Sequence, residues 1–110
     1  MRHPNLAVRE KSCLLVIDFQ ERLLRVLHNP DAVTDNCRRL VQGARLLGIP
    51  ILVTTQNAAR LGPTAPGLAE VLGEFEALDK LSFSCCGDQG FLHRLDALQN
   101  ARYAQSVIDR

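Results

Sequence analysis

Two short apolar runs, each followed by polar residues, constrain the fold of this sequence more than any other feature. Residues 12–18 read SCLLVID, and residues 49–55 read IPILVTT. Continuous apolar runs of this length, rich in Leu, Ile and Val, are typical of parallel strands buried on both faces. The segment between them, residues 31–47, predicts the connecting helix. The sequence therefore predicts a βαβ unit at the start of a parallel sheet.

The helix expected over residues 31–47 has the clearest periodicity in the chain. Its apolar side chains recur at steps of three and four and form one stripe, made of Val33, Cys37, Leu40, Val41, Ala44 and Leu47. We expect Asp31, or alternatively Thr34, to cap the first turn of this helix. Gly48 stands where a left-handed residue ends a helix, and Pro50 prevents the helix from continuing.

The rest of the chain continues to alternate between helical and extended patterns, with no internal repeat and no linker. In order, we expect a short helix over 21–27, a loop over 56–67, a short helix over 68–75, a strand over 78–84, a helix over 87–101 and a short strand over 106–108. This order predicts an α/β fold of the Rossmann-like, three-layer αβα type, in which a parallel sheet lies between helices. Such folds bind ligands at the carboxyl ends of their strands.

The size and charge of the chain exclude several other classes of protein. Its 110 residues, of which 46% are hydrophobic and 23% charged, predict one globular domain over residues 1–110 and not a disordered chain. Lys and Arg number 13 against 12 Asp and Glu, with no basic block, so the charge pattern of a nucleic-acid-binding protein is absent. The apolar runs are too short to cross a bilayer, and the first residues lack the apolar segment of a signal peptide. We therefore expect a cytoplasmic protein that binds neither nucleic acid nor membranes.

The four cysteines and three histidines raise the questions of disulfide bonds and metal binding. Cys13 and Cys37 lie in apolar patterns and predict reduced core thiols, while Cys85 and Cys86 are adjacent in the chain. The histidines are scattered at spacings that match no zinc site. We expect neither a metal nor an organic cofactor.

Polar residues at the ends of the predicted strands mark the place where chemistry is expected. Asp18 ends the first strand, Gln56 follows the second, and Lys80 lies in the third. A carboxylate at the end of a buried strand is costly unless it is paired, which makes Lys80 the natural partner of Asp18. The alternative is structural, with Asp18 capping the helix that follows and Lys80 exposed to solvent.

Three segments of the sequence, in the right order, resemble the isochorismatase-like cysteine hydrolases. Residues 14–24, LLVIDFQERLL, are similar to the opening strand motif of that family. Residues 51–56, ILVTTQ, with the LGPT and Pro66 that follow, resemble the second strand and loop of its isochorismatase-domain branch. Residues 79–85, DKLSFSC, resemble the segment that carries its catalytic lysine. Three linked motifs over residues 12–98 are far more specific than any one of them.

The resemblance implies a triad of aspartate, lysine and cysteine that acts on a small molecule with an amide, ester, ether or related bond. Asp18 matches the aspartate, which accepts the proton of the thiol, and Lys80 matches the lysine, which sustains the ion pair. The cysteine thiolate then attacks an electrophilic carbon. Phe19, Gln20 and Gln56 are the residues expected to contact the substrate, with two alternatives left open: Gln20 also suits a helix start, and Phe19 a packing role.

No residue of this sequence matches the cysteine of the family. The resemblance places that cysteine after a further strand, in a glycine-containing loop that opens a helix, and the sequence ends before such a segment. We therefore expect a domain that is incomplete at its C-terminus and inactive by itself. Cys86, or its neighbour Cys85, is the alternative nucleophile because a helix is predicted to follow, although Asp88 would oppose a thiolate there.

Two further expectations concern the incomplete sheet and the loop after its second strand. A parallel sheet without its later strands leaves an edge and apolar helix faces open, which predicts a homo-oligomer. The competing hypothesis is a non-enzymatic interaction module that associates through the same exposed C-terminal edge. Residues 55–59, TQNAA, lack the Asp-x-His metal cluster of the nicotinamidase branch, so the resemblance implies a metal-free site.

Overall fold

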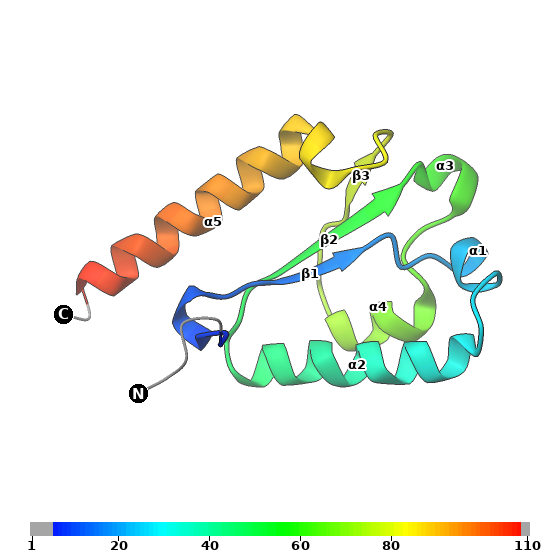
Figure 1. Ribbon diagram of the computed structural model, residues 1–110, viewed down its shortest axis with the longest axis horizontal. Coiled ribbons are helices and arrows are strands. Elements are labelled where there is room, and N and C mark those ends of the chain that lie inside the picture. The colour runs from blue at the N-terminus through cyan, green and yellow to red at the C-terminus, as the bar shows by residue number, and fades with distance from the viewer. Residues whose placement is uncertain (1–5, 109–110) are drawn as a thin grey trace.

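The computed structural model describes the backbone of residues 6–108 and the side chains of residues 6–100. Its strands are β1 (Leu14–Ile17), β2 (Ile51–Gln56) and β3 (Leu78–Lys80), and its short 3₁₀ helices are η1 (Arg9–Lys11) and η2 (Cys85–Gly87). Its α-helices are α1 (Glu21–Leu24), α2 (Pro30–Leu46), α3 (Ala58–Leu61), α4 (Pro66–Leu72) and α5 (Gln89–Ile108) (Figure 1). None of the helices in this range is long and apolar enough to span a bilayer.

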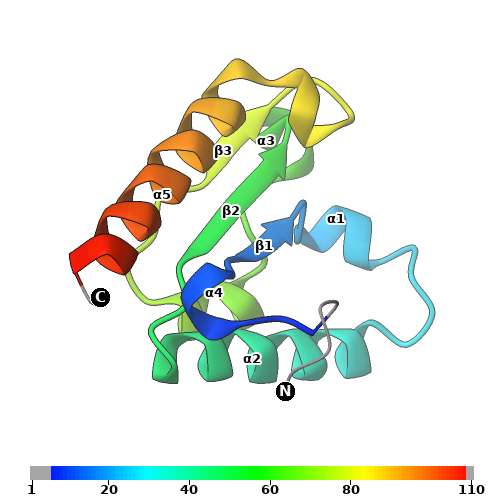
Figure 2. The ribbon, with the colours of Figure 1, turned by 60° about the vertical axis from the view of Figure 1, so that its left-hand side comes forward.

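The three strands form one parallel sheet in the order β1-β2-β3. Leu14 of β1 pairs with Ile51 of β2, and Thr54 of β2 pairs with Leu78 of β3. Helices α2 and α4 lie on one side of this sheet and α5 lies on the other (Figure 1, Figure 2). The predicted α/β architecture, with a parallel sheet between helices, is therefore confirmed.

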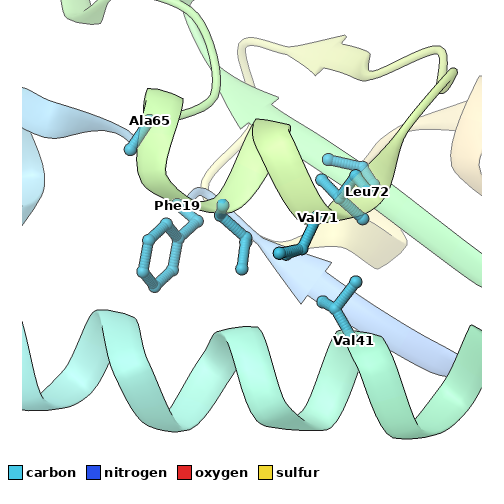
Figure 3. Close-up of a cluster of buried hydrophobic side chains, with 7 residues drawn as sticks. Phe19, Val41, Ala65, Val71 and Leu72 are labelled. Atoms are coloured by element: carbon cyan, nitrogen blue, oxygen red, sulfur yellow. The ribbon is translucent and has the colours of Figure 1, made fainter.

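The hydrophobic core lies between the sheet and the layer formed by α2 and α4 (Figure 3). Its buried side chains are Phe19, Val41, Val53, Ala65, Leu68, Val71 and Leu72. Leu14 and Val16 pack against this cluster from β1, because alternate residues of a strand point to the same face. Cys37 packs against it from α2, as its place in the helical stripe predicted.

The prediction that the first strand is buried on both faces is wrong. Burial alternates along β1, and the side chains of Leu15 and Ile17 are 38% and 52% exposed. Both lie on the face opposite the core, where α5 contacts η1 and η2 and leaves these two residues uncovered within the described part of the chain. Because β1 pairs only with β2 among residues 6–108, it is an edge strand of the sheet.

Helix α2 begins before the residues expected to cap it. Its N-cap is Asn29, whose side chain accepts a hydrogen bond from the N–H of Ala32, and not Asp31 or Thr34. Pro30 occupies the first helical position, where a missing N–H costs nothing. Beyond the helix, Gly48 has the left-handed conformation that was predicted, with a φ of +68°.

Other predicted boundaries also differ from the structure, and the helix expected over 21–27 ends at Leu24. The loop expected over 56–67 contains α3, and Pro66 opens α4 because proline suits the first position of a helix. The strand expected over 78–84 ends at Lys80. Helix α5 continues through residues 106–108, where a strand was expected, because the two apolar residues Val107 and Ile108 do not outweigh the helical propensity of the Ala- and Gln-containing segment before them.

Candidate active site

The candidate site lies at the carboxyl ends of the three strands. Asp18 directly follows β1, Gln56 is the last residue of β2, and Lys80 is the last residue of β3. Gln56 and Lys80 are paired in the register of the sheet, and parallel strands end at the same edge. The polar residues that the sequence analysis singled out are therefore brought to one place.

Asp18 and Lys80 form an ion pair at this edge. The Nζ of Lys80 lies 2.9 Å from Oδ2 of Asp18. The Lys80 side chain is 0% exposed, whereas the Asp18 side chain is 21% exposed. The expected pairing is thus present, and Lys80 is not exposed to solvent. Asp18 does not cap α1 either, since the N-cap residue there is Gln20.

The ammonium of Lys80 has a partner for every N–H that it can donate. Besides Asp18, its acceptors are Oε1 of Gln56 at 2.9 Å and the carbonyl oxygens of Phe83 at 3.2 Å and Ser82 at 3.4 Å. Four acceptors therefore surround a group with three N–H donors. Lys80 connects the ends of all three strands and the turn after β3, and it has no donor left over for another ligand in this arrangement.

The backbone of Asp18 is held in an unusual conformation. Its φ is +56°, in the left-handed region that costs a non-glycine residue about 1–2 kcal/mol. The N–H of Asp18 donates to the carbonyl oxygen of Thr54 at 3.1 Å and to its Oγ1 at 3.3 Å. The same Oγ1 donates to Oδ1 of Asp18 at 3.0 Å. Strain of this kind persists only where surrounding contacts fix it, and it clusters at functional sites.

The sequence analysis missed Thr54. It lies two residues before Gln56 on β2, so its side chain is on the same face of the sheet as those of Gln56 and Lys80. This period of two, applied from Gln56 backwards, is the signal that could have identified it.

Gln20, which lies shortly after β1, is hydrogen-bonded to Gln56 at the end of β2. Its side chain is fully buried; Oε1 accepts from the N–H of Gln56 at 2.8 Å, and Nε2 donates to the carbonyl oxygens of Gln56 and Gly62. The Gln56 side chain is more open: it accepts from Lys80 and donates to the carbonyl oxygen of Leu81. Phe19, 8% exposed, belongs to the core. That Phe19, Gln20 and Gln56 contact a substrate stays a prediction.

A second carboxylate, Asp79, also escaped the sequence analysis. Its Oδ1 accepts from Oγ1 of Thr55 at 2.9 Å and from the N–H of Ala58 at 2.8 Å. Asp79 therefore connects β3 to β2 and to the start of α3, which fixes the turn that follows Gln56.

The four cysteines make no hydrogen bond with the ion pair in the part of the chain that the structure describes. All four are free thiols. Burial raises the pKa of the Cys37 thiol above its ordinary value. Cys86 is exposed in η2. Asp88, which was expected to oppose a thiolate there, uses Oδ1 to accept from the N–H of Phe91. Within the described range no three His, Cys, Asp or Glu side chains cluster as a metal site would need.

The family of the chain follows from a comparison with known proteins. The isochorismatase domain family matches residues 12–102, a range that includes Asp18, Gln56 and Lys80. This chain belongs to the isochorismatase domain family. The resemblance noted from the three sequence motifs is therefore confirmed.

Individual relatives agree with this assignment. Isochorismatase domain-containing protein 2 of Rattus norvegicus is 38% identical over 76 residues, which cover 68% of this chain and 35% of the relative. The structure of the MAR1 ribonuclease of Caenorhabditis elegans is similar, with a TM-score of 0.71 and 35% identity over 80% of this chain and 46% of that one. The YcaC gene product of Escherichia coli, described as an octameric hydrolase of unknown specificity, shares the fold at a TM-score of 0.77 and 19% identity over 88% of this chain and 50% of that one.

The matches cover only part of these proteins. The chain spans 29% to 38% of the length of the curated relatives and 46% to 50% of the solved structures. The matching part of this chain thus corresponds to about half of each of these solved chains.

Proposed function

We propose that Asp18 and Lys80 form the acid–base part of an isochorismatase-like hydrolase site that acts on a small molecule with an amide, ester, ether or related bond. The observation that supports this most is the 2.9 Å ion pair between a fully buried lysine and a partly exposed aspartate at the strand ends. Lys80 holds the carboxylate in place, and the exposed part of Asp18 leaves acceptor positions open for a proton. Membership of the family supports the class of reaction.

In the proposed reaction Asp18 accepts the proton of a cysteine thiol, and the thiolate attacks the electrophilic carbon of the substrate. With an amide or ester, a C–S bond forms while the carbonyl π electrons move to oxygen. When the carbonyl re-forms, the bond to the leaving nitrogen or oxygen breaks, and the leaving group takes the proton from Asp18. Water then hydrolyses the thioester, which releases the acid and restores the thiol. Lys80 holds the Asp18 carboxyl group in its orientation throughout.

The nucleophile in this proposal is not one of the four cysteines of the chain. None of them is hydrogen-bonded to Asp18 or Lys80 among the described residues. Cys86 is the most accessible, but its segment is tied by a hydrogen bond from its own N–H to Ser84. These 110 residues by themselves are therefore expected to lack turnover, and a thiol supplied from outside is expected to restore it.

The proposal can be tested by supplying the thiol as a small molecule. We expect the purified chain with 2-mercaptoethanol to release nitrophenolate from 4-nitrophenyl acetate faster than Asp18→Asn does. The expected difference is about tenfold, smaller than the about 10²-fold of a general base whose nucleophile is also positioned. Asp35→Asn, which changes an exposed aspartate of α2, is the matched control and should react like the unmodified chain.

Two results would contradict this account of the site. Equal thiol-dependent rates for the unmodified chain and Asp18→Asn would remove Asp18 as the proton acceptor. Turnover without added thiol that disappears in Cys86→Ala would show that the chain holds its own nucleophile.

A second candidate function is a non-enzymatic interaction module. The sequence predicted association through a C-terminal edge, whereas the feature that favours association in the structure is the free edge of the first strand, β1. The N–H groups of Leu14 and Asp18 donate to the carbonyl oxygens of Pro50 and Thr54, on the β2 side of the strand. Those of Leu15 and Ile17 therefore point to the outer edge, where no strand pairs with them among residues 6–108. Their side chains are exposed and apolar. An exposed apolar strand edge is a site for pairing with another chain, and we propose a second copy of this chain as the partner.

Helix α2 adds a second apolar surface of this kind. Arg38 and Arg45 donate to carbonyl oxygens of the α4 segment, Gly67 and Val71. Leu40 and Leu47 each follow one of these arginines by two residues, about 200° around the helix, and so lie on the flank away from α4. They are 62% and 53% exposed. Association that covers these leucines would remove apolar surface from water, which is a further reason to expect it.

A further inference from the structure

We infer that Thr54 is a positioning residue for Asp18: its hydroxyl fixes the carboxylate in the orientation in which it accepts a proton. This inference deepens the proposed function and rests on it for the chemical role, while the orientation itself can be measured independently.

The hydroxyl of Thr54 is hydrogen-bonded to both the backbone and the side chain of Asp18. Thr54 is 2% exposed, so its hydroxyl is shielded from water. Its Oγ1 donates to Oδ1 of Asp18 at 3.0 Å and accepts from the backbone N–H of Asp18 at 3.3 Å. One hydroxyl therefore holds both the side chain and the backbone of the same residue.

Thr54 and Lys80 each donate a hydrogen bond to a different oxygen of the Asp18 carboxylate. Lys80 donates to Oδ2 and Thr54 donates to Oδ1, so each oxygen has one fixed bond. Each carboxylate oxygen offers about two acceptor positions. Since the Asp18 side chain is 21% exposed, the remaining positions face the open side of the site. Two fixed bonds also prevent the carboxylate from rotating about its χ2 angle.

The backbone conformation of Asp18 explains why these hydrogen bonds with Thr54 are needed. In the left-handed conformation, with φ at +56°, the chain after β1 turns sharply and carries the carboxylate across the end of β2. A non-glycine residue adopts this conformation only when its surroundings determine it. Thr54 supplies both its carbonyl oxygen and its hydroxyl to the N–H of Asp18.

The test compares Thr54→Val with Thr54→Ser. Valine keeps the shape and the β-branch of threonine and removes the hydroxyl, whereas serine keeps the hydroxyl. In crystal structures of the two variants, we expect the Asp18 carboxylate to move by about 1 Å or more in Thr54→Val and to stay in place in Thr54→Ser. In the thiol-supplied ester assay, we expect the maximal rate of Thr54→Val to fall about tenfold with little change in half-saturation, and Thr54→Ser to restore it.

The two readouts separate failure of this inference from failure of the proposed function. An unmoved carboxylate in Thr54→Val, or a rate equal to that of the unmodified chain, overturns the role of Thr54. Equal rates for the unmodified chain and Asp18→Asn overturn the proposed function instead, and the crystal structures then still decide whether Thr54 orients Asp18. If Thr54→Val does not fold, Thr54→Ala is measured in the same two ways.

Discussion

The carboxyl ends of the strands and the outer edge of β1 meet at Asp18, which directly follows β1, and they are opposite in character. At the strand ends, the fully buried Lys80 has an acceptor for every donor. Along β1, Leu15 and Ile17 expose apolar side chains on the face opposite the core, and no strand pairs with the outer edge of β1 within residues 6–108. At the strand ends the hydrogen bonds of the buried cation are satisfied, whereas the outer edge of β1 has no pairing strand among residues 6–108.

This difference separates the part of the site that the described residues form by themselves from the part that they do not form. The ion pair needs only elements that are present, because Asp18, Gln56 and Lys80 follow three adjacent strands. The proposed function, by contrast, takes its nucleophile from outside these residues, and the outer edge of β1 has no pairing strand among residues 6–108. The acid–base pair can therefore be tested on this chain alone.

The largest expected effect comes from removing the buried cation. Lys80→Met leaves the Asp18 carboxylate, the Gln56 amide oxygen and two carbonyl oxygens without their donor. Breaking a buried pair in this way costs about 3 kcal/mol or more, measured as the free energy of unfolding in urea. Because Asp18 is partly exposed, water offsets some of the loss.

The chain offers a matched control for that measurement. Its only other lysine, Lys11, is exposed in η1, so Lys11→Met should change the free energy of unfolding by less than about 0.5 kcal/mol. Similar losses for both variants would mean that Lys80 contributes no more than a surface lysine, and the contrast between the two regions would disappear.

A substitution at the outer edge should affect association and not folding. Ile17→Lys places a charge on an exposed position of β1, so we expect a change of less than about 0.5 kcal/mol in the free energy of unfolding of the monomer. At high protein concentration, sedimentation should show association of the unmodified chain and its loss in Ile17→Lys. Val26→Lys, at a residue 82% exposed after α1, is the control and should still associate. A chain that stays monomeric at high concentration would remove the interaction-module hypothesis.

The smallest expected effect is a pH dependence from Cys37. Burial raises the pKa of this thiol in the folded chain, so as the pH rises the unfolded chain loses the proton first. The contribution to stability is therefore complete below the ordinary thiol pKa and is lost as the pH rises above it toward the raised value. This loss should be smaller than the effects of the substitutions described above.

Urea unfolding at neutral and alkaline pH measures this contribution. The alkaline loss should shrink in Cys37→Ala and persist in Cys86→Ala, because Cys86 is exposed. An alkaline loss that is unchanged in Cys37→Ala would assign it to another group.

Much of this fold could be predicted because the relevant signals are local. The apolar run before Asp18 and the three-four spacing of α2 each report one element, and the parallel order follows from alternating strands and helices. The site could be predicted in the same way, since three polar residues at the ends of three strands of a parallel sheet meet at one edge. Asp18 and Lys80 could thus be paired before any distance was known.

The missed features depend on contacts between distant segments. Whether Leu15 and Ile17 are covered is decided by where α5 lies, and strand periodicity carries no information about that. The left-handed turn at Asp18, and the double use of the Thr54 hydroxyl that stabilises it, likewise require the register of β1 against β2. Helix caps were misplaced for a simpler reason: Asn29 precedes a proline that already begins the helix.

The most direct test of the central claim, a buried ion pair between Lys80 and Asp18, is NMR of the chain labelled with ¹⁵N-lysine. The chain has two lysines, one exposed and one fully buried, so the side-chain spectrum holds two signals at most. We predict that the Lys80 ammonium exchanges its protons slowly enough to be seen at neutral pH and that its signal shifts or disappears in Asp18→Asn. A spectrum in which neither ammonium is protected, or a protected signal that is unchanged in Asp18→Asn, would contradict the account.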